Sequence, residues 1–455
     1  MSIFYEDSSI KVYNKSCTNM SEIPDDSIHC IVTSPPYFGL RTYSGNQDLI
    51  WGGDKDCKHE WGELIKQIGH HSGETNPGKE GYTKDANQWS NEKGVFCIKC
   101  GAWQGQFGLE PNLELYIEHF VVICREIKRV LRKDGTFWLN LGDSYAGSGS
   151  PGGDYRNGKG GDDYLRPYNH NGKGLKPKDL MMIPHRIAIA LQDDGWWVRS
   201  DIVWHKSNGM PESAEDRPTG THEYIFLLTK SAHYYFDYIA IQEKAKYDGR
   251  KDTTIKPGGK YIDRNHLSNG TKAESFHVKE AERWVSEING EPARNCRDVW
   301  EFPTESSPCK HFAVFPQELA ERCIKSGTSD KGCCSKCGAP YKRIVSDFQT
   351  KHDGMINSKY DTKDKLNYSP ARMALFRQHL REHGMENKPS SETTGWEPTC
   401  NCQAEIVPCV TLDPFSGSGT TAWVSKKLAR KSIAYELSEE YCHLIVNRNR
   451  QQVLL

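Results

Sequence analysis

Residues 410–421, with the sequence VTLDPFSGSGTT, restrict the fold of this chain more than any other segment. The apolar and β-branched residues 409–412 predict a buried strand, and residues 420–428 predict a helix. Between the two, Gly417 and Gly419 allow the backbone to turn sharply and to approach a ligand closely. A strand that passes through a tight glycine loop into a helix is a building unit of α/β proteins.

Other segments alternate between strand and helix in the same way. Residues 28–33 (IHCIVT) predict a buried strand, which the two prolines that follow bring to an end. Residues 113–131 carry apolar side chains at steps of four and three, which predicts a helix, and residues 136–141 (TFWLNL) predict the next strand. Further helices are expected at 180–191 and 315–327, and further strands at 196–204, 224–229 and 432–435. We therefore expect an α/β fold with a doubly wound, mostly parallel sheet.

Polar stretches interrupt this pattern and predict insertions. At 455 residues the chain is about three times as long as an average domain. The core is expected to comprise residues 1–56, 101–240, 300–332 and 403–455, with insertions at 57–100, 241–299 and 333–402.

Charge and hydropathy narrow the class of protein. The net charge is −1, so a surface that binds nucleic acid must concentrate its positive charge on one face. The sequence contains no run of about 18 apolar residues, so we expect no membrane-spanning helix. The first residues lack a basic segment followed by an apolar one, so we expect a cytoplasmic rather than a secreted protein.

Two carboxylates accompany the glycine loop. A dinucleotide site would need a third glycine, which this loop lacks. Asp413 precedes the loop, where it would repel a pyrophosphate but suit a cationic ligand such as the amino group of a methionyl moiety. Glu436 ends the next predicted strand, at a spacing of about 20 residues that suits a carboxylate bound to ribose hydroxyls.

Two motifs and their order resemble one family. Residues 413–421 (DPFSGSGTT) and 33–37 (TSPPY) together are similar to the S-adenosylmethionine-dependent amino-DNA methyltransferases, which methylate an exocyclic amine of a base. The tetrapeptide comes first and the glycine loop last, which resembles the permuted, beta-class members. The segments VLRKDG, THEY and HFAVFP extend the resemblance over most of the chain. It implies a Rossmann-like methyltransferase core that acts on double-stranded DNA, with a cognate restriction endonuclease as a candidate partner.

The chemistry of such a reaction accounts for the tetrapeptide Ser34-Pro35-Pro36-Tyr37. An exocyclic amine is a poor nucleophile because its lone pair is delocalised into the ring. The Ser34 hydroxyl and the Pro35 carbonyl would accept hydrogen bonds from the amine and pull its nitrogen toward tetrahedral geometry, with both prolines fixing the backbone. Tyr37 would stack on a base that has been flipped out of the duplex.

The resemblance also implies which residues bind S-adenosylmethionine. They are the residues of the glycine loop, the carboxylate after the next strand, an aromatic residue of HFAVFP and one cysteine near the N-terminus, namely Asp413, Pro414, Phe415, Ser416, Gly417, Ser418, Gly419, Thr420, Thr421, Glu436, Phe315 and Cys17. Phe415 or Tyr37 would add cation–π attraction to a sulfonium.

The target base is predicted from the first residue of the tetrapeptide. Within the family, serine there resembles the cytosine-N4 enzymes and Asp or Asn resembles the adenine-N6 enzymes, so Ser34 favours cytosine N4 and leaves adenine N6 as the alternative. Methylation of cytosine C5 needs a cysteine after a proline; Cys309 and Cys409 meet that condition, but no Glu-Asn-Val motif accompanies them. Two alternatives of other classes are a nicotinamide-dependent oxidoreductase that uses residues 413–421, and a zinc-containing DNA-binding protein with an inactive methyltransferase core.

Sixteen cysteines in a chain without a secretion leader favour metal binding over disulfides. Two sets of four side chains have spacings typical of a closed tetrahedral zinc site, namely Cys57, His59, Cys97 and Cys100, and Cys334, Cys337, Cys400 and Cys402. We expect two structural zinc ions, and reduced thiols without metal are the alternative. Cys333 competes with Cys334, but the C-x-x-C spacing favours Cys334.

Basic and aromatic residues interleave at 155–173 and 246–260. Such segments are typical of proteins that neutralise phosphates and stack on exposed bases, although a solvated surface is the alternative. Residues 238–297 are the candidate region for contacts with base edges.

Overall fold

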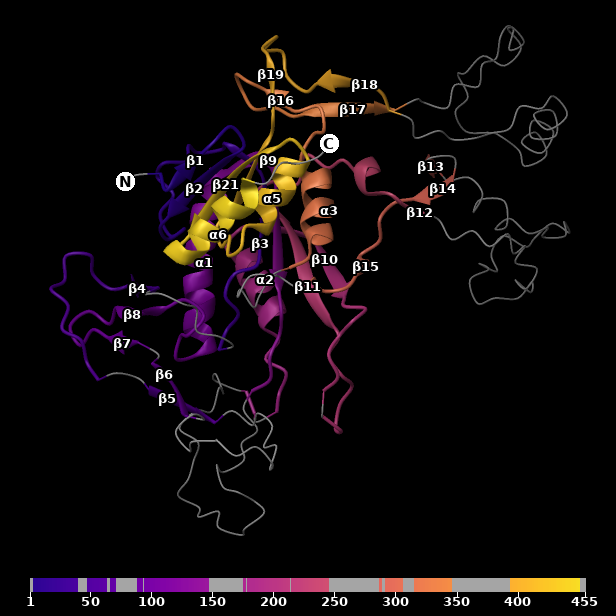
Figure 1. Cartoon of the computed structure of the whole chain (residues 1–455). Helices are drawn as coiled ribbons and strands as arrows, with labels where there is room; N and C mark the ends of the chain where they lie inside the picture. The colour runs from indigo at the N-terminus through magenta and orange to yellow at the C-terminus, as the bar shows by residue number, and fades with distance from the viewer. Residues whose placement is uncertain are drawn as a thin grey trace, which may run out of the picture. The chain divides into compact units, whose positions relative to one another are not determined.

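The computed structural model divides the chain into two compact units (Figure 1). The first comprises Met1–Phe236, Arg297–Pro340 and Cys402–Leu455, and the second comprises Asp237–Cys296 and Tyr341–Asn401. The structure describes residues 3–39, 47–63, 66–70, 88–92, 94–146, 175–176, 178–212, 214–244, 286–288, 291–305, 315–345 and 393–450. The division into a core and three insertions stays a prediction. Among the described helices, none combines the length and the apolar content that crossing a bilayer requires.

A nine-stranded sheet lies at the centre of the first unit, in the order β1-β2-β21-β20-β3-β9-β11-β10-β15. Its strands are β1 (Tyr5–Glu6), β2 (Ile10–Asn14), β3 (Ile28–Thr33), β9 (Leu131–Leu141), β10 (Trp197–His205), β11 (His222–Thr229), β15 (Val299–Glu301), β20 (Val410–Asp413) and β21 (Lys431–Glu436). The five consecutive strands β2, β21, β20, β3 and β9 are parallel to one another, and β10 is parallel to β15. In contrast, β1 is antiparallel to β2, and β11 is antiparallel to both β9 and β10. The predicted α/β class with a mostly parallel sheet is confirmed.

Helices flank the sheet in two groups (Figure 1). The helix α1 (Leu113–Val130) packs against α2 (Ile183–Asp193), and α5 (Thr420–Lys427) packs against α3 (Gln317–Gly327) and α6 (Glu439–Asn449). The chain crosses from β3 to β9 through α1 and from β20 to β21 through α5, in opposite directions along the sheet. Because such crossovers are right-handed, α1 and α5 lie on opposite faces, as a doubly wound fold requires.

The boundary between α1 and β9 differs from the predicted one. The sequence pattern places Leu131 in the helix and starts the strand at residue 136, but the helix ends at Val130 and Leu131 is already extended, with φ −65° and ψ 137°. Partners outside the helix account for this early end. Ser27 N donates to the carbonyl of Val130 at 2.9 Å, and Lys230 Nζ donates to that of Leu131 at 2.7 Å.

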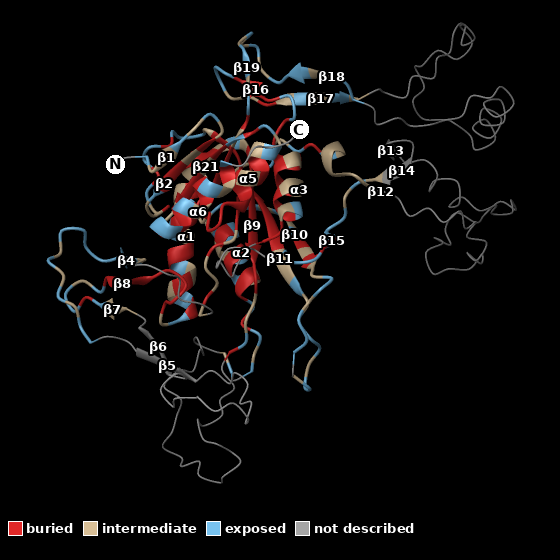
Figure 2. Ribbon diagram, in the orientation of Figure 1, coloured by how far each residue is buried: buried red, intermediate tan, exposed pale blue. Residues whose placement is uncertain are grey.

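One hydrophobic core joins α1, the central strands and a small sheet of β4 (Asp48–Trp51), β8 (Trp103–Gln106) and β7 (Val95–Phe96). Figure 2 shows the buried residues concentrated on the central strands and on the sides of the helices that face them. Other described strands are β5 (Lys66–His70), β6 (Gln88–Glu92), β16 (Cys333–Cys334) and β19 (Ile406–Val407) in the first unit, and β12 (Glu243–Lys244), β13 (Ser286–Ile288), β14 (Glu291–Arg294), β17 (Tyr341–Val345) and β18 (Thr393–Pro398) in the second.

Candidate functional site

The two sequence motifs meet at one edge of the central sheet. The strands β3 and β20 are adjacent and parallel, with Ile31 paired to Leu412, so both strands end at the same edge. The tetrapeptide follows β3 and the glycine loop follows β20. A hydrogen bond of 2.6 Å from Thr33 Oγ1 to Asp413 Oδ1 links the two segments. The carboxyl ends of strands are where ligands bind in doubly wound sheets.

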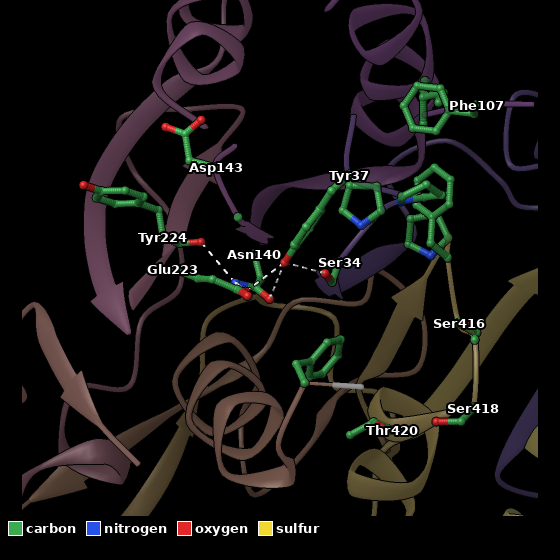
Figure 3. Close-up of a pocket in the computed structure, with 18 of the residues that line it drawn as sticks. Ser34, Tyr37, Phe107, Asn140, Asp143, Glu223, Tyr224, Ser416, Ser418 and Thr420 are labelled. Atoms are coloured by element: carbon green, nitrogen blue, oxygen red, sulfur yellow. Dashed lines mark hydrogen bonds between the residues drawn. The ribbon is translucent and has the colours of Figure 1, made fainter. Parts of the chain in front are cut away.

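A cavity of about 890 Å³ lies at this edge (Figure 3). Most of the predicted catalytic and ligand-binding residues line it, namely Cys17, Ser34, Pro35, Pro36, Tyr37, Phe315, Pro414, Phe415, Ser416, Gly417, Ser418, Thr420 and Glu436. The other three, Asp413, Gly419 and Thr421, are buried and do not belong to this lining. The two motifs therefore share one cavity. Asp413 and Thr421 do not form the surface of this cavity but support the glycine loop.

Asp413 holds the start of the glycine loop. Its Oδ1 accepts hydrogen bonds from the Thr33 hydroxyl and from the N–H of Phe415 at 3.1 Å, and its Oδ2 accepts one from the Thr421 hydroxyl at 2.7 Å. Burial of the carboxyl raises its pKa to about 6, although these hydrogen bonds act in the opposite direction. Gly419 follows with a φ of 76°, a left-handed conformation that permits the sharp entry into α5.

Glu436 provides a second carboxylate beside the loop. It ends β21, lines the cavity, and accepts hydrogen bonds of 2.9 Å from the N–H groups of Gly417 and Ser438. Burial raises the pKa of Glu436 to about 7, and the charge of Asp413 acts in the same direction. A carboxylate at this strand end is positioned to accept hydrogen bonds from a ribose.

The tetrapeptide is fixed by hydrogen bonds as well as by its prolines. The hydroxyl of Ser34 donates to the Tyr37 hydroxyl oxygen at 3.1 Å. The hydroxyl of Tyr116, on α1, donates to the carbonyl of Pro36 at 2.8 Å. Because proline also restricts φ, the segment presents its side chains and carbonyls in one conformation.

Sequence reasoning missed several residues of this cavity. Asn140 of β9 and Glu223 of β11 both hydrogen-bond the Tyr37 hydroxyl (Figure 3), and Phe107 stacks on Phe415 with ring centroids 5.8 Å apart. Asn140 carried a signal, because it is a polar residue inside an apolar strand. The position of Glu223 depends on the antiparallel pairing of β11 with β9, which the sequence does not reveal.

The first predicted cysteine set is assembled in space. The Sγ atoms of Cys57 and Cys97 are 4.0 Å apart, the Sγ of Cys100 is 3.4 Å from Nδ1 of His59, and all four ligand atoms lie within 4.8 Å of one another. In a tetrahedral zinc site with Zn–S bonds of about 2.3 Å, two sulfurs lie about 3.8 Å apart. Gly101, with a φ of 73°, donates its N–H to the carbonyl of Cys97 and closes the turn. The donor set and its spacing fit a zinc ion.

The second predicted set is divided between the two units. Cys334, Cys337 and Cys402 belong to the first unit, and their Sγ atoms lie within 4.8 Å of one another. Cys400 belongs to the second unit, so its place as the fourth ligand stays a prediction. Cys333 has different partners, since its thiol donates to a backbone carbonyl of β19 at 3.5 Å.

A third group, His29, Cys333 and Cys409, is buried and was not singled out from the sequence. The N–H of Val410 donates to Nδ1 of His29 at 3.0 Å, and Nε2 of His29 is hydrogen-bonded to the carbonyl of Gly338 at 2.8 Å. Both ring nitrogens therefore bind backbone groups, which leaves no imidazole lone pair for a metal.

Comparisons with known proteins place these observations in a family. The N6/N4 methyltransferase family model, described as DNA methylase, matches residues 28–348 and 409–447. The chain is 39% identical over 420 residues to the type II methyltransferase M.SmaI of Serratia marcescens, covering 92% of this chain and 83% of that protein. It is 33% identical over 309 residues to the type II methyltransferase M.Cfr9I of Citrobacter freundii, covering 68% and 69%.

Among solved structures, the chain is similar to the PvuII DNA methyltransferase (cytosine-N4-specific), with a TM-score of 0.43 and 13% identity over 97% of this chain and 86% of that chain.

Proposed function

This chain belongs to the N6/N4 family of DNA methylases, and we propose that it transfers a methyl group from S-adenosylmethionine to the exocyclic N4 of cytosine in double-stranded DNA. The observation that carries this proposal is the single cavity that Ser34 lines from the end of β3 and the glycine loop lines from the end of β20. A methyl donor at the loop and an amine at Ser34 would face each other in it. Such orientation of reactants supplies up to about 7–11 kcal/mol of a barrier.

The residues around the glycine loop fit S-adenosylmethionine. When bound, this cofactor supplies an electrophilic methyl carbon attached to a positively charged sulfur. Glu436 accepts hydrogen bonds from the ribose hydroxyls, and Phe415 and Phe315 offer aromatic faces that attract a cation. At about 890 Å³ the cavity lies near the top of the ~300–1,000 Å³ range of ligand sites, which leaves room for a nucleobase beside the cofactor.

The tetrapeptide receives the target amine. Ser34 Oγ and the Pro35 carbonyl accept its two N–H groups, which concentrates the lone pair on the nitrogen that attacks the methyl carbon. The ring of Tyr37 stacks on a base flipped out of the duplex. A serine rather than an acidic residue at position 34 favours cytosine N4 over adenine N6.

We also propose one structural zinc at each predicted cysteine set. Four protein ligands leave no open position on the metal, so these ions stabilise the segments that bind them and take no part in the transfer.

The basic segments 155–173 and 246–260 lie outside the described residues, as do Cys309 and residues 311–314. Residues 238–297 remain our candidate for sequence recognition, and base flipping, a cognate endonuclease and a cytoplasmic location remain predictions.

Mass spectrometry of digested DNA tests the proposed base. DNA from cells that express the wild-type chain should contain N4-methylcytosine, and DNA from cells that express Ser34→Ala at the same level should not. N6-methyladenine in place of N4-methylcytosine would overturn the assignment of the base. Absence of both modified nucleosides would overturn the proposed activity.

A further inference from the structure

A chain of hydrogen bonds runs from the tetrapeptide to Glu223, a carboxylate of the segment THEY to which no role in the site was assigned from the sequence. Ser34 Oγ lies 3.1 Å from the Tyr37 hydroxyl oxygen, which lies 2.8 Å from Oε2 of Glu223 (Figure 3). Ser34, Tyr37 and Glu223 all line the cavity described above. The hydroxyl of Tyr37 therefore makes contacts that stacking on a base does not require.

The direction of this chain follows from the groups themselves. An ionised carboxylate can only accept hydrogen bonds, so Tyr37 donates its single hydroxyl hydrogen to Glu223. Asn140 Oδ1 also lies within reach of that hydrogen, at 3.2 Å, but a charged acceptor at 2.8 Å forms the stronger bond. The Tyr37 oxygen then accepts the hydroxyl hydrogen of Ser34. The lone pairs of Ser34 Oγ can therefore accept hydrogen bonds from other donors. The free side of Ser34 is thus an acceptor, as an amine N–H requires.

Neighbouring groups hold Glu223 and Tyr37 in this arrangement. Asn140 Nδ2 donates to Glu223 Oε2 at 3.0 Å, and Lys206 Nζ forms an ion pair with Glu223 Oε1. The Glu223 side chain is 15% exposed and lines the cavity. Gly142 packs against the Tyr37 ring so closely that an added Cβ would lie 2.7 Å from a ring carbon. The relay is therefore rigid at its centre and reaches a carboxylate that is partly accessible to water.

We propose that Ser34, Tyr37 and Glu223 carry away the proton that the amine loses, with Glu223 as the terminal acceptor; this inference rests on the proposed function. As the nitrogen–carbon bond forms and the sulfur–carbon bond breaks, the sulfur becomes neutral and the methylated nitrogen carries the positive charge. Its proton moves to Ser34 Oγ, the Ser34 hydrogen moves to the Tyr37 oxygen, and the Tyr37 hydrogen moves to the Glu223 carboxylate. The base leaves neutral, and Glu223 returns its proton to water.

Single-turnover methyl transfer tests the relay directly. Radiolabelled S-adenosylmethionine and duplex DNA are incubated with excess enzyme, and DNA and cofactor affinities are measured separately. Glu223→Gln retains the shape of the side chain but is not a base, and we expect the transfer rate to fall about 100-fold with both affinities unchanged. Tyr37→Phe keeps the ring for stacking and should give a similar loss. Glu223→Asp keeps a carboxylate and should recover part of the rate.

A double variant separates a relay from two independent effects. If the groups act in series, Glu223→Gln combined with Tyr37→Phe should be about as slow as either alone. Glu318→Gln, which also removes a glutamate from an ion pair but lies on α3, should transfer at the wild-type rate. A wild-type rate in Glu223→Gln, or losses that multiply in the double variant, would overturn the relay. A wild-type protein that labels no DNA would instead overturn the proposed function.

Discussion

The strand-end cavity and the first cysteine set are both built from segments far apart in the sequence, but different forces hold them. The cavity lies at the ends of buried, paired strands, and Asp413 with its three hydrogen bonds ties one of its loops to β3. The cysteine set lies on short strands and turns, and Cys57 and Cys100 are only half-buried. Sheet pairing thus positions the first site without a ligand, whereas we expect the second to depend on the zinc ion that we propose it binds.

The largest effect is expected at the cavity, from Ser34→Ala. The substitution removes one acceptor for the target amine, and the loss of one such preorganised group lowers a rate by about 10²–10³-fold. Cofactor affinity should stay within about twofold, since the glycine loop is unchanged. Single-turnover transfer and calorimetric titration with S-adenosylmethionine measure the two quantities.

A matched control for this substitution is Ser21→Ala, which removes an exposed hydroxyl. Its rate should equal that of the wild type. Full activity of Ser34→Ala would contradict the proposed role of Ser34 as an acceptor for the target amine.

Asp413→Ala tests whether hydrogen bonds position the cavity without a ligand. The change leaves the hydroxyls of Thr33 and Thr421 and the N–H of Phe415 without their buried acceptor, so we expect the free energy of unfolding to fall by about 3 kcal/mol. Asp413→Asn keeps an acceptor oxygen and should lose less than half of that. Urea denaturation followed by tryptophan fluorescence measures both values. A loss below about 0.5 kcal/mol for Asp413→Ala would show that the loop is held by other contacts.

The raised pKa values of Glu436 and Asp413, about 7 and about 6, predict opposite responses of stability and binding to pH. The folded protein binds more protons than the unfolded chain between about pH 4 and pH 7, so the stability contributed by both groups falls as pH rises through that range. In the proposed cofactor site, the ionised form of Glu436 would accept the ribose hydroxyls. The dissociation constant of S-adenosylmethionine should therefore be about tenfold higher at pH 6 than at pH 8.

Calorimetric titration at the two pH values measures this difference. Glu436→Gln cannot ionise and should bind weakly with little dependence on pH. A wild-type dissociation constant that does not change between pH 6 and pH 8 would remove Glu436 from the ribose site.

Of the substitutions considered, Cys97→Ser should change cofactor binding in the cavity least. It should mainly reduce the zinc content and the stability of the segment around Cys97. The variant should lose one zinc per chain in elemental analysis, and limited proteolysis should cleave around residues 94–101 sooner than in the wild type. S-adenosylmethionine affinity should change less than about threefold, because the glycine loop is held by the sheet. Cys296→Ser belongs to neither set and should keep the wild-type zinc content. Unchanged zinc in Cys97→Ser would show that this set does not bind the metal.

The predictable parts of this molecule are those that local patterns determine. The strands before Ser34 and Asp413 could be predicted because short apolar runs end at prolines or glycines. Their adjacency comes from the structure, since neither strand's own sequence specifies its neighbour in the sheet. The early end of α1 could not be predicted, because the groups that hydrogen-bond the carbonyls at its end come from distant parts of the sequence. They are the Lys230 ammonium and the N–H of Ser27. Glu223 was missed for the same reason, since strand pairing over 80 residues places it beside Tyr37.

The most direct test of the account uses purified protein, duplex DNA and S-adenosylmethionine labelled with ¹³C in its methyl group. After digestion of the DNA, mass spectrometry identifies the nucleoside and the atom that carry the label. The account predicts the label on N4 of cytosine. Label on any other base or atom, or DNA that stays unlabelled while the protein binds the cofactor, would contradict it.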